Sequence, residues 1–186
     1  MTAGQVLPTA TAQILRDPND WIARMAAEPN RIPWVPWTWF TLAAILGSLI
    51  YGASLQLATG AFEAPVVSAI RLTVASGAGW IVLGPALILI GKVHPFVAAH
   101  ACLVAMTYGE GVLLLTAAAN LSALLIGASV GSILFNGFAI FCANTLMAFV
   151  LAGQLQSIGT PFKTTLALWY ALLNGTGVLV FLTLPL

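Results

Sequence analysis

The chain has 186 residues and a formal net charge of +1; hydrophobic residues make up 60% of it and charged residues 6%. A soluble core cannot hide so much apolar surface in so short a chain, and no basic cluster indicates binding to nucleic acid. We therefore expect an all-α fold, a polytopic membrane bundle of five transmembrane helices in residues 34–186, preceded by a cytoplasmic or interfacial N-terminal segment, residues 1–33.

The N-terminal segment contains a short predicted helix from Asp17 to Glu28. Asp17 is a suitable N-cap, Pro18 suits the first helical position, and prolines 29 and 33 end the helix. One face is apolar and the opposite face is charged, which is typical of a helix lying at a membrane interface. Three roles stay open for this helix: docking on its own bundle, contact with lipid, and binding of a partner.

Five apolar stretches follow, and each is long enough for a hydrocarbon core about 30 Å thick, which needs roughly 20 residues per helix. The predicted spans are residues 35–58, 68–91, 95–118, 126–152 and 164–183. Residues 119–125 are expected to form a break between the third and fourth spans. Tryptophan favours the headgroup level, so four tryptophans are predicted interface anchors: Trp21, Trp34, Trp37 and Trp39.

The basic residues predict the orientation, because positive charge near short loops tends to stay in the cytoplasm. A cytoplasmic N-terminus leaves only Arg71 near the outer face. The other five basic residues then lie inside: Arg16, Arg24, Arg31, Lys92 and Lys163. We therefore expect a multi-pass protein of a bacterial inner membrane, with its N-terminus in the cytoplasm and its C-terminus outside.

Glu110 is the most informative single residue, because an ionisable group inside a span is costly and often functional. Arg71 on the second span is the candidate cation at a similar depth. The pattern is consistent with an ion pair or a hydrogen-bonded carboxyl, with a proton or solute pathway, and with a site that binds a partner subunit.

The predicted fourth span carries a polar face and a pair of small residues. Helical spacing places the polar side chains along this face: Ser129, Ser132, Asn136 and, two turns further on, Asn144. Gly127 and Gly131 have the spacing that lets two membrane helices approach closely. Helix packing explains the whole pattern, and the alternative is a polar cavity that includes Glu110.

His100 lies about one turn into the predicted third span. One imidazole can ligate the metal of a haem or a chlorophyll-type pigment, but a second histidine at matching depth is missing, because His94 lies at the membrane edge. His100 is therefore either a hydrogen-bonded structural residue or a pigment ligand. The sequence predicts no metal site and requires no cofactor, and lipids are the expected bound molecules.

Several short motifs resemble the Ypt-interacting protein (YIP) domain family, whose members are five-span membrane proteins. The motifs are Ile14-Leu15-Arg16-Asp17-Pro18 with Trp21, Tyr108 in the third span, Gly153-Gln154-Leu155, and Phe162-Lys163. The resemblance implies a five-span fold over residues 14–184. A second run, Pro33-Trp34-Val35-Pro36-Trp37, is similar to the tryptophan-rich sensory (translocator) proteins, which also have five spans.

No enzyme signature is present, since the chain lacks a nucleotide-binding glycine loop, a nucleophile elbow and a metalloprotease spacing. The expected function is that of a non-catalytic accessory, assembly or scaffold subunit of a larger membrane complex, for instance a photosynthetic or respiratory one. Its partners would be lipids and other membrane subunits. The alternatives are a small transporter or channel component using Glu110, and a pigment-binding or haem-binding subunit using His100.

Overall fold

The computed structural model describes residues 12–28, 35–59, 65–126 and 133–184, and the all-α prediction is confirmed for them, with no strand in these ranges. Their helices are α2 (Pro18–Ala27), α3 (Val35–Thr59), α4 (Pro65–Leu89), α5 (Pro95–Leu125), α6 (Ile133–Gln156), α7 (Phe162–Leu168), the π-helical turn η2 (Trp169–Asn174) and α8 (Gly175–Thr183). The last three follow one another without a gap.

Four stretches of these helices are long and apolar enough to cross a membrane: Ala69–Leu89, Pro95–Leu125, Leu134–Gln156 and Phe162–Thr183. In α3 the apolar stretch among the described residues is shorter and covers Ala44–Leu57. Large apolar side chains lie on the outer surfaces of the helices, and Ile81, Leu115 and Phe138 are among the most exposed. These features are compatible with a multi-pass integral membrane protein.

The helix ends differ from the predicted spans mainly near residue 120. The break predicted over residues 119–125 is wrong, because α5 continues as a helix to Leu125. Alanine favours the helix there, and the Asn120 side chain is hydrogen-bonded to Asn136 instead of competing for the backbone. The described part of α6 begins at Ile133, and residue 126, the predicted start of the fourth span, is the C-cap of α5.

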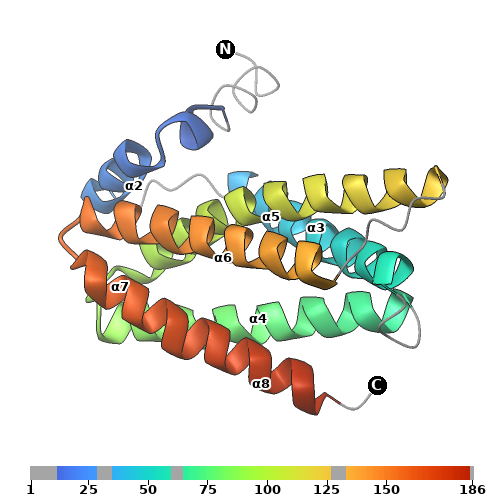
Figure 1. Cartoon of the computed structure of the whole chain (residues 1–186). Coiled ribbons are helices and arrows are strands. Elements are labelled where there is room, and N and C mark those ends of the chain that lie inside the picture. The colour runs from blue at the N-terminus through green and yellow to red at the C-terminus, as the bar shows by residue number, and fades with distance from the viewer. Residues whose placement is uncertain (1–11, 29–34, 60–64, 127–132, 185–186) are drawn as a thin grey trace.

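Helix α5 is the most buried of the four candidate spans. It packs most extensively against α3 and α6, whereas α4 packs against α3 and against the helix formed by η2 and α8. The α4–α5 and α6–α7 turns lie at the end where α2 sits, and the C-terminus lies toward the opposite end (Figure 1). The interface between α3 and α5, called the α3–α5 seam below, is thus flanked by α4 and α6.

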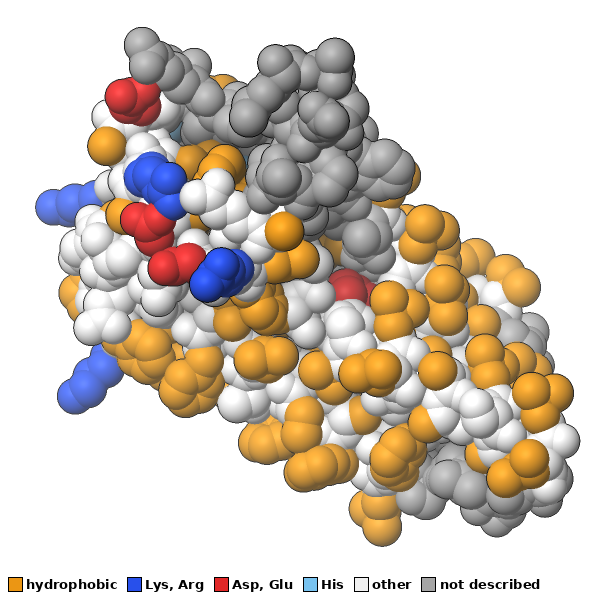
Figure 2. Space-filling view, turned by 90° about the horizontal axis from the view of Figure 1, so that it is seen from above, with side chains coloured by type: hydrophobic (Ala, Val, Ile, Leu, Met, Phe, Trp, Pro, Cys, Tyr) orange, Lys and Arg blue, Asp and Glu red, His pale blue; other side chains and the backbone are white. Residues whose placement is uncertain are grey.

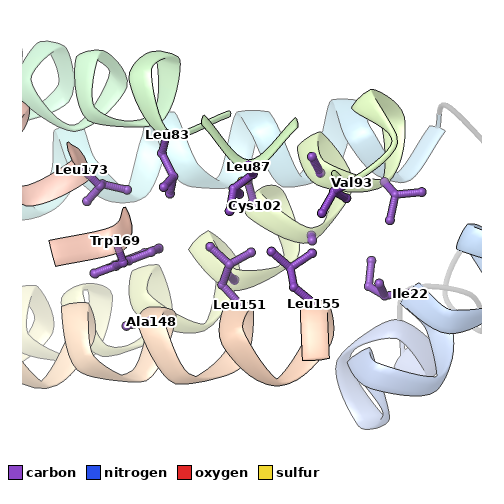
Figure 3. Close-up of a cluster of buried hydrophobic side chains, with 14 of the residues drawn as sticks. Ile22, Leu83, Leu87, Val93, Cys102, Ala148, Leu151, Leu155, Trp169 and Leu173 are labelled. Carbon is purple, nitrogen blue, oxygen red and sulfur yellow. The ribbon is translucent and has the colours of Figure 1, made fainter. Parts of the chain in front are cut away.

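The largest hydrophobic cluster joins α2, α4, α5, α6 and η2 (Figure 3). Trp169 of η2 is fully buried in it, and the Trp80 ring meets the Trp169 ring edge to face, with 5.2 Å between ring centroids. Gly79 permits this approach, since a Cβ there would lie 2.7 Å from the carbonyl oxygen of Leu173. The π-helical turn is thus packed tightly against α4.

Helix α2 is docked on the bundle, against α5 and α6. Its N-cap is Asp17, whose side chain accepts a hydrogen bond from the backbone N–H of Asp20 at 3.1 Å. Ile22 and Met25 are buried, while Asp20 and Arg24 form an ion pair on the exposed face. Most of the charged side chains seen in Figure 2 gather at this end of the molecule, and hydrophobic side chains cover the rest. Of the three roles considered for α2, docking on its own bundle describes the structure.

Replacing Ile22 by alanine is expected to lower the free energy of unfolding by about 2–5 kcal/mol, because the substitution leaves a cavity in the cluster of Figure 3. Thermal unfolding of the purified protein in mild detergent measures the loss. Ala27→Ser, at an exposed position of the same helix, is the matched control and should be near neutral. Equal stability of the two variants would contradict the docked position of α2.

Candidate functional site

The first buried polar group in the bundle is the carboxyl of Glu110, halfway along α5. Its side chain is 6% exposed, and its Oε1 accepts a hydrogen bond of 2.8 Å from the Ser48 hydroxyl of α3. Its Oε2 is buried without a hydrogen-bond partner. Gly47 makes room for this oxygen, because a Cβ at position 47 would lie only 2.2 Å from it. The carboxyl therefore fills a niche on the α3 backbone that only glycine leaves open.

Arg71 is not the partner of Glu110. No ion pair between described residues joins the two side chains, and Nε of Arg71 is itself buried without a hydrogen-bond partner. Of the two forms considered for a structural carboxyl, an ion pair and a hydrogen-bonded group, the structure has the second. The reason is the packing order: α4 contacts mainly α3 and α8, while α3 presents Ser48 to Glu110.

A second set of buried polar side chains, Tyr51, Asn120 and Asn136, joins α3, α5 and α6 further along the same seam. The Tyr51 hydroxyl donates to the side-chain oxygen of Asn136 at 3.3 Å, and Nδ2 of Asn120 donates to the same oxygen at 2.9 Å. All three side chains are 1% exposed or less. They lie next to an apolar cluster that contains Leu113 and Ala117. These contacts hold three helices together at positions closed to solvent.

Asn144 makes a different contact, although it is on the same helix as Asn136. Its Oδ1 accepts a hydrogen bond of 2.7 Å from the indole N–H of Trp169, and its Nδ2 donates to Asn174 at 2.8 Å. Both partners belong to η2, and π-helical turns are frequent at functional sites. The asparagines of α6 therefore serve two separate contacts and do not line one cavity with Glu110.

His100 is fully buried beneath α2, and its Nε2 accepts a hydrogen bond of 2.9 Å from the indole N–H of Trp21. This bond uses the lone pair that a haem or pigment metal would need at Nε2. The histidine thus links α5 to α2 in the structure. Among the residues that the structure describes, no group of three His, Cys, Asp or Glu side chains is placed to hold a metal ion.

Several predicted site residues lie where the structure gives no description. Gly127, Gly131, Ser129, Ser132 and Trp34 lie outside the described residues, and the side chains of Trp37 and Trp39 are not described although both belong to α3. The packing role of the glycine pair and the anchoring role of these three tryptophans therefore stay predictions.

A cavity of about 480 Å³ lies at the α2 end of the bundle, between the α4–α5 and α6–α7 turns. Lys92, His94 and Thr160 are among its lining residues. None of the buried polar side chains of the α3–α5 seam lines it. The cavity and the Glu110 niche are separate features.

Sequence reasoning missed the residues that surround Glu110. Gly47 and Ser48 form the niche, and Tyr51, three positions later on the same face of α3, belongs to the second set of buried polar side chains. The available signal was this spacing of a small residue, a hydroxyl and a tyrosine inside an apolar span. Asn120 was interpreted as part of a break, whereas it pairs with Asn136.

Comparison of the chain with protein-family models, with curated proteins and with solved structures gives no significant match. The resemblance to the YIP domain family therefore stays a prediction from the motifs alone. The function has to be argued from the residues and their contacts.

Gly47→Ala is expected to lower the free energy of unfolding by about 1–3 kcal/mol, because the new methyl group overlaps the Glu110 carboxyl. In a Glu110→Ala background the same change should cost much less, since the nearest remaining atom of residue 110, its Cβ, lies 3.3 Å away. Chemical unfolding of the wild type, of Gly47→Ala, of Glu110→Ala and of the double variant gives the double-mutant cycle.

Gly77→Ala on α4 is the control, because nothing lies within 4 Å of the added Cβ. This substitution should be neutral or stabilising, as expected for glycine replaced without a clash. An equal cost of Gly47→Ala in both backgrounds would contradict the niche.

Proposed function

We propose that this chain is a five-span protein of a bacterial inner membrane, with α2 on the cytoplasmic side and the C-terminus outside. In this proposal it has no catalytic activity and acts as an accessory, assembly or scaffold subunit of a larger membrane complex. Its partners are lipids and other membrane subunits. The fifth span is α3, whose described apolar part is shorter than those of the other four helices.

The observation that carries the proposal is how the buried polar side chains are used. Glu110 accepts from Ser48, Asn120 pairs with Asn136, and Asn144 accepts from Trp169. Each contact joins one helix of the chain to another. This use of polar groups is typical of a protein whose task depends on its shape, because a catalytic site presents its polar groups to a substrate.

The position of the charges supports the orientation. Arg16 and Arg24 belong to the N-terminal segment, Lys92 lies in the α4–α5 turn, and Lys163 lies at the start of α7. The N-terminal segment, the α4–α5 turn and the start of α7 lie toward the same end of the bundle, and the start of α4, the half with Arg71, lies toward the other (Figure 1). Basic residues gathered on one side of a span favour the cytoplasm for that side.

The contacts of α2 and of the residues just before it support a docking role for the YIP-like motifs. The Tyr108 hydroxyl donates to the carbonyl oxygen of Leu15, and Trp21 donates to His100. Gly153 lies beside Asn19, since a Cβ on the glycine would be 3.5 Å from the asparagine Oδ1. Motifs far apart in the sequence thus meet where α2 is docked. In the proposal this docking leaves the outer surfaces of α4, α5, α6 and α8 to lipid and partner subunits.

Purification from native membranes in a mild detergent tests the proposal. A second membrane protein is expected in a fixed ratio to the tagged chain through affinity purification and size exclusion, with both identified by mass spectrometry. The control is the same purification from membranes that carry the untagged chain. A monomer free of partners under these conditions would overturn the accessory role.

A further inference from the structure

The two oxygens of the Glu110 carboxyl have different surroundings. Oε1 accepts the hydrogen bond from Ser48, whereas Oε2 lies against the Gly47 backbone without a hydrogen-bond partner. The side chain is 94% buried, as follows from its exposure of 6%. This is an ionisable group deep in an apolar bundle with a single donor.

An ionised carboxylate at this place would lack the partners that a buried charge needs. Such a charge requires a cation or several donors, and otherwise the group takes up a proton and becomes neutral. Titratable groups on the helices packed against α5 include Tyr51 on α3, Arg71 on α4 and Cys142 on α6, and no described contact joins them to the carboxyl. The charged side chains of α2 are exposed at the end of the bundle.

A neutral carboxyl fits the niche as it stands. Oε1 is then the carbonyl oxygen that accepts from Ser48, and Oε2 carries the hydrogen. No cation and no further donor is required. The buried hydroxyl of Tyr51 and the amides of Asn120 and Asn136 continue the row of polar groups along the same seam, on the side of Glu110 toward the C-terminal end of α5.

We propose that the carboxyl of Glu110, in the niche formed by Gly47 and Ser48, is a proton-binding site inside the membrane that exchanges its proton with water. The ligand is the proton itself, bound at Oε2. This site goes beyond the accessory role proposed above and does not depend on it.

Infrared spectroscopy of the purified protein tests both parts of the proposal. At neutral pH the wild type is expected to show the C=O stretching band of a protonated carboxyl, and transfer to D₂O should shift the band as deuterium replaces the proton. Glu110→Gln, which keeps the shape of the side chain, should lack the band. Glu28→Gln, at the exposed C-cap of α2, should keep it.

A folded wild-type protein without the band, or with a band that D₂O does not shift, would overturn the proposal. A second readout is labelling by dicyclohexylcarbodiimide, an apolar reagent. The protonated acid adds across one C=N bond, its oxygen binding the central carbon and its proton going to nitrogen, and no group leaves. Labelling is expected at residue 110 of the wild type, and protection by sodium ions at constant pH would show that a cation, not a proton, occupies the site.

Discussion

The cost of a polar group in an apolar medium is the constraint on which the rest of this structure depends. Water is absent from a hydrocarbon core, so each buried polar side chain needs a partner inside the protein. At three places the chain meets this need with contacts between helices: Ser48 with Glu110, Asn120 with Asn136, and Trp169 with Asn144. Other buried polar atoms, Oε2 of Glu110 and Nε of Arg71 among them, have no such partner. These contacts also determine which helices are neighbours, because each one requires two helix faces at the same depth.

The N-terminal helix follows the same rule at the edge of the bundle. The indole N–H of Trp21 pairs with the buried His100, and the carbonyl oxygen of Leu15 accepts from Tyr108. The charged face of α2 stays exposed, at the same end as the α4–α5 turn with Lys92 and the start of α7 with Lys163. The amphipathic helix α2 thus packs its apolar face on the bundle and leaves its charged face exposed, so that charged side chains gather at this end of the molecule.

Composition was sufficient to predict an all-α membrane protein, because long apolar runs leave few alternatives to helices in lipid. The individual contacts were harder to predict. Arg71 is the candidate cation for Glu110 in the sequence, but α3 supplies the partner, and an order of packing is not visible in the sequence. Asn120 indicated a break because its partner Asn136 follows sixteen residues later, beyond any local pattern. Ser48 by itself gives no distinct signal, since single serines are common in apolar spans, and only its spacing with Gly47 and Tyr51 could have indicated the niche.

In a membrane, the outer faces of these helices are expected to contact lipid. Spin labels at Ile81, Leu115 and Phe138, which are 75%, 75% and 66% exposed, test it most directly in reconstituted vesicles. The labels are attached to single cysteines in a Cys102→Ser, Cys142→Ser background, and Asn19 on the exposed face of α2 is the control. Oxygen, which dissolves in lipid, is expected to relax the three labels more than a water-soluble nickel complex does. At Asn19 the nickel complex is expected to relax the label more than oxygen does. Stronger relaxation by nickel at the three helix positions would contradict it.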